Sequence, residues 1–218
     1  MTKHFLFDFD GTLVDSMGYW AKAMTNVLDN HGIKYSEDIV SIITPLGSAG
    51  TIAYFQKLGI DLPAHDIAME IGNNLTPLYQ KVIPEKSGVR HCLSEMKKRG
   101  FHLHVLTASP HVWLDPCLER LGLSELFDNV WSSDDFERSK NDPEIYRMAA
   151  EKIGVSVEEI TFLDDNLNAD KAAKASGVKV IGVYDDSTRE NESEMRKITD
   201  AYIYNFTDLE EMVVKNVE

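Results

Sequence analysis

The chain has 218 residues, of which 43% are hydrophobic and 27% charged, enough for one well-buried domain or for one domain carrying a smaller insert. Its formal net charge of −14 repels nucleic acids and anionic membranes over most of the surface, so we exclude both as partners. A phosphate site on such a surface needs local cations or backbone N–H donors.

The first predicted strand carries two aspartates, in the segment FLFDFDGTLVDS at residues 5–16. Side chains alternate along an extended strand, so Asp8 and Asp10 are expected on one side and the phenylalanines on the other. Two adjacent carboxylates repel each other unless a cation or a shared proton stabilises them. The alternative is a frayed strand end entering a turn, because Asp and Gly are common turn residues.

The next part of the chain, residues 16–83, carries apolar residues at helical spacing and little that indicates a strand. We predict helices at residues 17–32, 36–44, 49–59 and 64–82. Proline and glycine residues separate them, at Pro45, Gly47, Gly50, Gly59 and Pro63.

From about residue 88, predicted strands alternate with predicted helices. We expect strands at 102–107, 129–133, 160–165, 179–185 and 201–206, and helices at 89–100, 110–122, 143–154, 169–177 and 207–213. This alternation is typical of an α/β fold with a doubly wound parallel sheet. The opening strand has no partner before residue 102, so we predict an inserted all-helical cap at residues 16–84 and a core formed by residues 1–15 and 85–218.

Ligands of doubly wound sheets bind at the carboxyl ends of the strands, and polar residues follow four of the predicted strands. These residues are Asp8 and Asp10, Thr107, Lys140 in the loop after the third strand, and Asp164 and Asp165. Carboxylates gathered in one crevice suit a hard cation such as Mg²⁺. A lysine and a threonine hydroxyl suit the charge and the acceptor oxygens of a phosphoryl group.

Four motifs in this order carry a resemblance to a known family: DFDGT (8–12), LTAS (106–109), KNDPEIY (140–146) and LDDN (163–166). The chain closely resembles the haloacid dehalogenase-like (HAD) superfamily, and within it the helical-capped phosphatases of the phosphoglycolate phosphatase and beta-phosphoglucomutase-like group. The resemblance covers nearly the whole chain. It implies a Rossmann-like core with a helical cap inserted after the first motif.

The resemblance also implies a role for each motif residue. Asp8 is the expected nucleophile and forms an aspartyl-phosphate, while Asp10 is the expected general acid and base and binds Mg²⁺ through its backbone carbonyl. Thr107 and Lys140 are expected to hold the phosphoryl group. Asp165 is expected to complete the metal site, with Asp164 beside it. An aspartate that splits hydrolysis into two displacements is chemically sensible.

Backbone donors near these motifs extend the predicted site. We assign Gly11, Thr12, Ala108 and Ser109 to substrate binding, because turn amides donate to phosphate oxygens and a glycine lets the chain approach a ligand closely. Each assignment has a structural alternative: Thr107 as a strand-end hydroxyl or helix cap, Lys140 as a loop lysine, and the paired aspartates as a turn.

Asp170 is left out of the predicted primary site. Many relatives carry a second acidic residue four positions after the one matching Asp165, but that position here is Ala169. Asp170 is expected near the start of a helix, where an acidic residue is favourable. Whether Asp164 or Asp170 contacts the metal directly or through water stays open.

The predicted cap supplies candidate contacts to the remainder of the substrate. We expect Gly47 and Ser48, on a glycine-rich loop at residues 45–50, to bind substrate. Tyr19 and Trp20, on the first cap helix, are expected to pack between cap and core rather than to bind a ligand.

The favoured function is a magnesium-dependent phosphatase that acts on a small phosphorylated metabolite, such as a sugar phosphate or a phosphoglycolate-like compound. The alternatives are a phosphosugar mutase and a non-catalytic phosphometabolite-binding protein. Relatives that act as mutases carry a histidine on the first cap helix, whereas this chain has Met17-Gly18-Tyr19-Trp20, which favours hydrolysis. The substrate and the oligomeric state stay open.

Cys92 and Cys117 lie in predicted helices without metal-binding or redox spacing, so we expect small core residues in a reducing compartment. No segment resembling a signal peptide precedes the first strand, and no apolar run approaches the ~18 residues that span a bilayer. We therefore expect a cytoplasmic protein.

Overall fold

The computed structural model describes residues 3–43 and 46–215. Contacts divide the chain into two compact units, one formed by the segments up to Asp15 and from Pro84 onward, the other by Ser16–Ile83. Pro84, which the sequence predicts as the last cap residue, belongs to the larger unit. Its carbonyl oxygen accepts a hydrogen bond from the Asp15 N–H at 3.0 Å.

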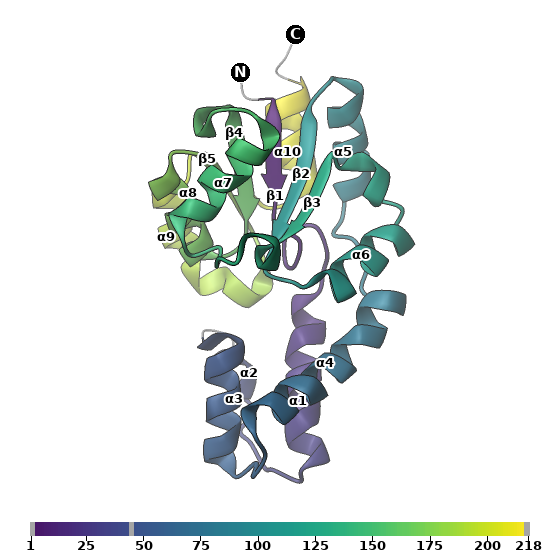
Figure 1. Cartoon of the computed structure of the whole chain (residues 1–218), viewed down its shortest axis with the longest axis vertical. Helices are drawn as coiled ribbons and strands as arrows, with labels where there is room; N and C mark the ends of the chain where they lie inside the picture. The colour runs from purple at the N-terminus through teal and green to yellow at the C-terminus, as the bar shows by residue number, and fades with distance from the viewer. Residues whose placement is uncertain (1–2, 44–45, 216–218) are drawn as a thin grey trace. The chain divides into compact units, whose positions relative to one another are not determined.

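The larger unit is built on a parallel sheet, with six strands within the described residues in the order β3-β2-β1-β4-β5-β6 (Figure 1). The strands are β1 (His4–Phe7), β2 (His102–Thr107), β3 (Asn129–Ser132), β4 (Ile160–Asp164), β5 (Lys179–Val183) and β6 (Ala201–Ile203). The strand order reverses at β1, as in a doubly wound sheet. The α/β fold class predicted from the sequence is confirmed.

Helices cover both faces of this sheet (Figure 1). One face carries α7 (Pro143–Ile153) and α8 (Leu167–Ser176), and the other carries α5 (Val89–Lys98) and α10 (Phe206–Glu210). The chain also forms α6 (His111–Arg120), α9 (Glu192–Ile198) and short helical turns at residues 124–126, 133–136, 157–159, 186–191 and 211–215.

Alternating side chains of β1 serve the two faces. Leu6 lies in the hydrophobic cluster that contains Tyr146 of α7 and Ala173 of α8. Phe5 and Phe7 point the other way, since the ring of Phe7 contacts the ring of Phe206 in α10 at a centroid distance of 6.3 Å. Burial on both faces explains why this strand reads as a continuous apolar run.

β1 ends earlier than the sequence predicts. Its last ladder residue is Phe7, and Asp8 still donates its N–H to the Leu163 carbonyl oxygen at 2.8 Å. The chain then closes a turn in which the Val14 N–H donates to the Phe9 carbonyl oxygen at 3.0 Å. The predicted strand therefore does not extend to Asp10, which lies in the turn, and the expectation that Asp8 and Asp10 share one side stays a prediction.

Local sequence signals fix the starts of the two helices nearest the strand ends. Asp142 caps α7 by accepting a hydrogen bond from the Glu144 N–H, and Pro143 occupies the first turn. Asn166 caps α8 by accepting from the Asn168 N–H at 2.9 Å. Helix α8 therefore begins at Leu167, two residues before the predicted start.

The smaller unit is helical and comprises α1 (Met17–Asn30), α2 (Ile39–Ile43), α3 (Gly47–Leu58) and α4 (Ala64–Lys81). Helices α1 and α4 pack together, and Trp20 Nε1 donates to the Tyr79 hydroxyl at 2.7 Å. Trp20 therefore contacts another residue of the same unit, and its expected packing between cap and core stays a prediction.

Gly47 and Ser48 lie in the first turn of α3 and are exposed. The predicted loop is therefore wrong at residues 47 and 48, residues 49 and 50 belong to the predicted helix at 49–59, and Pro45 lies outside the described residues. Gly47 and Ser48 add an exposed first turn to a helix whose buried residues are Thr51 and Phe55, although glycine is a poor helix former.

Both cysteines are free and buried, as predicted. Burial raises the pKa of Cys92 to about 12 and that of Cys117 to about 11, so both thiols stay protonated and unreactive at neutral pH. Among the helices of residues 3–43 and 46–215, none is long and apolar enough to cross a membrane.

Candidate active site

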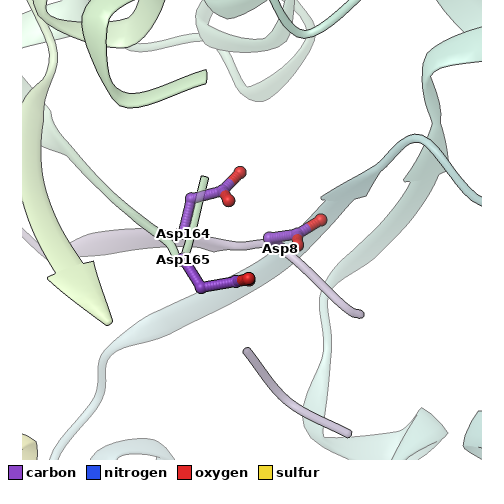
Figure 2. Close-up of side chains that lie close together, drawn as sticks. All are labelled: Asp8, Asp164 and Asp165. Atoms are coloured by element: carbon purple, nitrogen blue, oxygen red, sulfur yellow. The ribbon is translucent and has the colours of Figure 1, made fainter. Parts of the chain in front are cut away.

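Three aspartates meet at the carboxyl ends of two neighbouring strands. Asp8 follows β1, and Asp164 and Asp165 stand at the end of β4, which pairs with β1 through Phe7 and Leu163. All three are buried, and one carboxylate oxygen from each lies within 4.8 Å of the others (Figure 2). The strand-end prediction correctly brings these residues together.

Lys140 joins two of these carboxylates. Its Nζ donates to Asp8 Oδ1 at 2.5 Å and to Asp164 Oδ2 at 2.6 Å. Burial disfavours the ammonium ion, but the charges of Asp164 and Asp8 outweigh burial and raise the pKa of Lys140. The Tyr146 hydroxyl donates to the Lys140 carbonyl oxygen at 2.9 Å and holds the loop in place. Lys140 is therefore a fixed cation at the centre of the site.

The two aspartates at the end of β4 are held by different donors. The Asn166 N–H donates to Asp164 Oδ1 at 2.7 Å, and the Thr12 hydroxyl donates to Asp165 Oδ1 at 3.0 Å. Burial raises the pKa of Asp164 to about 7, with a further contribution from Asp8 that Lys140 opposes. Burial also raises the pKa of Asp165, and the charges of Asp164 and Asp8 add to this effect.

Asp170 adds an unpartnered acid to the same region. It lies in the first turn of α8, as predicted, but its side chain is fully buried and neither carboxylate oxygen has a hydrogen-bond partner. Burial and the charges of Asp164 and Asp165 raise its pKa to about 10. The predicted place of Asp170 near a helix start is therefore confirmed, and the burial of its carboxylate is a feature that the sequence did not indicate.

The donor set fits a hard divalent cation such as Mg²⁺. Asp8, Asp164 and Asp165 offer only oxygen ligands, and as carboxylates they carry more negative charge than Lys140 neutralises. Burying an uncompensated carboxylate costs several kcal/mol (~3–5). A cation bound between Asp8 and Asp165 would remove much of that cost.

Asp10 is held apart from this cluster by the loop after β2. Its Oδ2 accepts from the Ser109 hydroxyl at 2.5 Å, and the Ser109 N–H donates to the Thr107 hydroxyl at 3.1 Å. Within the described residues, the group of converging metal-type ligands does not include the Asp10 side chain. A role of Asp10 at the metal through its backbone carbonyl stays a prediction. Ala108 is exposed between the two hydroxyl residues.

The first motif ends in a tight approach between the backbone and Asp165. Gly11 has a φ of 79°, and a Cβ atom there would lie 2.5 Å from Asp165 Oδ2. Thr12, predicted as a substrate contact, is fully buried and uses its hydroxyl to hold Asp165. These two residues position the Asp165 carboxylate, and the predicted contact of Thr12 with substrate stays a prediction.

We expect Gly11→Ala to destabilise the protein by about 1–3 kcal/mol and to lower turnover at least ~10-fold, because both φ and the Asp165 contact become strained. Gly154→Ala is the matched control: its φ is 85°, but no atom lies within 4 Å of an added Cβ. Chemical denaturation and initial rates of both variants give the measurement. Equal effects of the two substitutions would show that the Asp165 contact is unimportant.

His111, not predicted as a functional residue, links two loops beside the site. Its Nδ1 lies 2.8 Å from Asp115 Oδ1 in the same helix, and its Nε2 lies 2.8 Å from Asp135 Oδ2 in the turn after β3. Hydrogen bonds to Asp115 and Asp135 raise its pKa. A protonated His111 therefore ties the start of α6 to the segment that leads to Lys140.

The His111 contacts stabilise the folded state only while the imidazole is protonated. Because the folded-state pKa is raised, this stabilisation is complete below the unfolded pKa of about 6.5 and disappears as pH rises through the folded value. We expect His111→Gln to reduce the free energy of unfolding by less than about 1 kcal/mol at pH 5.5, since exposed pairs are screened, and to have little effect at pH 8.5. Urea unfolding at both pH values tests this, and a larger effect at pH 8.5 would contradict it.

Comparison with known proteins identifies the class that this fold and site define. Residues 5–183 match the family model described as "Haloacid dehalogenase-like hydrolase". The chain belongs to this family, which confirms the resemblance seen in its motifs. It is an enzyme, a hydrolase of the phosphatase type, as predicted.

Curated relatives carry phosphatase names. The chain is 27% identical over 177 residues to "Phosphorylated carbohydrates phosphatase" of Thermotoga maritima, covering 81% of this chain and 82% of that protein. It is 30% identical over 182 residues to "Pyrophosphatase PpaX" of Bacillus velezensis, covering 82% and 81% of the two chains. It is 24% identical over 190 residues to a "Phosphoglycolate phosphatase" of Pseudomonas syringae, covering 84% and 70%.

Solved structures of other proteins have a similar fold over nearly the whole length of this chain. CbbY from Rhodobacter sphaeroides, crystallised in complex with phosphate, is 26% identical with a TM-score of 0.80, covering 96% of each chain. A mutant of the same protein, crystallised with xylulose-(1,5)bisphosphate, is 25% identical with a TM-score of 0.80 and the same coverage.

Proposed function

We propose that this chain is a Mg²⁺-dependent phosphatase that hydrolyses a small phosphorylated metabolite through an aspartyl-phosphate on Asp8. The observation that carries the proposal is the buried group of Asp8, Asp164 and Asp165 with Lys140 bridging the first two. A carboxylate nucleophile needs nearby positive charge, because an anionic phosphoryl group otherwise repels it. Lys140 supplies part of this charge.

In the first step, a carboxylate oxygen of Asp8 attacks phosphorus, and the bond between phosphorus and the leaving oxygen breaks. Asp10 gives its proton to that oxygen. The ammonium of Lys140 and the Thr107 hydroxyl bind phosphoryl oxygens, together with the backbone N–H group of Ala108. The Gly11 and Ser109 N–H groups, which the sequence also predicts as donors, are bonded here to the Val14 carbonyl and the Thr107 hydroxyl. Asp8 then carries the phosphoryl group covalently.

In the second step, Asp10 takes a proton from water as the water oxygen attacks phosphorus. The bond between phosphorus and Asp8 breaks, and phosphate and the free Asp8 carboxylate result. The Ser109 hydroxyl, 2.5 Å from Asp10 Oδ2, holds the Asp10 carboxyl in position for both transfers. The same side chain therefore serves as acid and then as base.

The residues proposed to hold Mg²⁺ are Asp8, Asp165, Asp164 and the backbone carbonyl of Asp10. When bound, the ion supplies positive charge that offsets the charge of the phosphoryl oxygens. Thr12 holds Asp165 through a hydrogen bond. Gly11 has no side chain, and this leaves room for the Asp165 carboxylate beside the backbone.

The proposed substrate class is a sugar phosphate or a phosphoglycolate-like compound. Relatives named for phosphorylated carbohydrates and phosphoglycolate support it, as does the similarity to a protein crystallised with a sugar bisphosphate. Gly47 and Ser48 stay proposed contacts to the part of the substrate beyond its phosphate. Both are exposed at the start of α3.

The test is phosphate release by the purified protein with Mg²⁺, from para-nitrophenyl phosphate and from a panel of phosphorylated metabolites. We expect release from members of the proposed class, with free phosphate as the product. An isomeric sugar phosphate without free phosphate would indicate a mutase instead. No release from any compound would refute a phosphatase.

A further inference from the structure

Lys86 lies outside the sequence motifs but contacts the first of them. It lies two residues after Pro84, where the chain re-enters the larger unit. Its Nζ donates to three oxygen atoms: the Gly11 carbonyl at 2.6 Å, the Tyr184 carbonyl at 2.9 Å and Asp185 Oδ2 at 2.8 Å. Tyr184 and Asp185 come directly after β5. One ammonium group therefore connects the turn after β1 to the loop after β5.

The backbone of Lys86 contacts the same turn. Its N–H donates to the Leu13 carbonyl oxygen at 2.9 Å, and Val14 forms an antiparallel bridge with Glu85. Main chain and side chain of Lys86 thus hold both ends of the segment from Gly11 to Leu13. A lysine that only covered the surface would not make partly buried hydrogen bonds to two carbonyl oxygens.

Asp185 keeps this ammonium group in place. It is buried, its Oδ1 accepts from the Ser187 N–H at 2.9 Å, and its Oδ2 accepts from Lys86. The ion pair fixes the direction of the lysine side chain, because both partners are largely removed from solvent. Lys86 therefore acts on Gly11 as a rigid donor.

The position of Gly11 matters because of what lies on its other side. Its Cα approaches Asp165 so closely that a Cβ would lie 2.5 Å from Oδ2, and the adjacent Thr12 hydroxyl donates to Oδ1. Lys86 binds the carbonyl oxygen of Gly11, and Gly11 and the next residue, Thr12, are the ones that contact Asp165. A shift of the turn would therefore displace Asp165.

We propose that Lys86 is a positioning residue for catalysis, which holds the Gly11 turn against Asp165 through its bond to the Gly11 carbonyl. This inference rests on the proposed function for its effect on turnover. It assigns Lys86 no contact with substrate, so its loss lowers kcat and leaves KM nearly unchanged. A displacement of about 1 Å in such a site lowers turnover ~100-fold.

The experiment combines kinetics with amide hydrogen exchange on the full chain. Lys86→Met removes the ammonium at similar length, and Lys86→Arg keeps a charged donor. The exchange of peptides covering residues 9–14 reports on the turn, because the Gly11, Leu13 and Val14 N–H groups are bonded within it. Lys179→Met, an exposed lysine at the other end of β5, is the matched control.

We expect Lys86→Met to lower kcat at least 10-fold with KM within 2-fold of wild type, and to speed exchange in residues 9–14 at least 10-fold. Lys86→Arg should recover part of both effects, and Asp185→Asn should give smaller ones, since the Gly11 bond survives. Lys179→Met should match wild type. If Lys86→Met does not fold, Lys86→Gln replaces it, with the same expected directions.

Two results would overturn the inference: unchanged exchange in residues 9–14, or faster exchange with unchanged kcat. A purely structural lysine would lower the melting temperature and leave kcat and the exchange of this turn at their wild-type values. Failure of the proposed function is distinguishable, because it would appear as an inactive wild-type enzyme. Exchange would still report on the Gly11 turn in that case.

Discussion

Asp8→Asn is expected to abolish phosphate release, with kcat at least ~10³-fold below wild type, in a protein that stays folded. The amide has no anionic oxygen to attack phosphorus, and Lys140 loses one of its two carboxylate partners. Stability should not fall in the absence of Mg²⁺, because the charge of Asp8 contributes to the raised pKa of both Asp164 and Asp165. Initial rates and thermal unfolding of the same preparation give the measurement.

Asp10→Asn is the matched control for this substitution, since it removes a neighbouring carboxyl but keeps the nucleophile. With para-nitrophenyl phosphate, whose leaving group needs no proton, we expect a burst of para-nitrophenol stoichiometric with enzyme, followed by slow turnover. Asp8→Asn should give no burst. A burst from Asp8→Asn would show that another residue is the nucleophile.

Removal of divalent cations by a chelator is expected to lower turnover at least ~100-fold, and Mg²⁺ should restore it. Mg²⁺ should also raise the melting temperature, since a ligand at 100 times its Kd stabilises the folded state by about 2.7 kcal/mol. Asp165→Asn should reduce this stabilisation. Activity that survives the chelator, together with an unchanged melting temperature, would contradict a metal-dependent enzyme.

The stabilising effect of Mg²⁺ should depend on pH. An acid whose folded-state pKa is raised favours folding below its unfolded pKa of about 3.9, and that contribution is lost as pH rises towards the folded value. For Asp164 the folded-state pKa is about 7, so at pH 8 its carboxyl group is mostly ionised and most of the free-energy cost of burying this charge is present. We therefore expect a larger Mg²⁺-induced rise in melting temperature at pH 8 than at pH 5, measured by scanning calorimetry.

The sequence predicts the parts of this site that follow from strand ends. Buried strands such as residues 102–107 read as apolar runs, and the polar residue after each run marks the ligand edge of a parallel sheet. Asp8, Asp164 and Lys140 are brought together for this reason. The same rule applied to β5 would have indicated Asp185.

The rest depends on packing that no local pattern records. Lys86 reaches the first motif from a linker, and the burial of Asp170 follows from the direction in which α8 packs. Strand β1 ends at Phe7 because the following residues form a turn, in which the Val14 N–H donates to the Phe9 carbonyl oxygen. Gly47 and Ser48 look like loop residues because glycine is a poor helix former, and the helix forms there despite that preference.

The central place of β1 delays assembly of the sheet during synthesis on the ribosome. His4 pairs with His102 on one side and with Ile160 on the other, so the nascent strand emerges long before either neighbour exists. Until then its phenylalanines are exposed to solvent or to a chaperone that binds apolar segments. A ribosome stalled shortly before codon 160 should therefore hold an aggregation-prone chain, and release of a full-length chain should end that vulnerability.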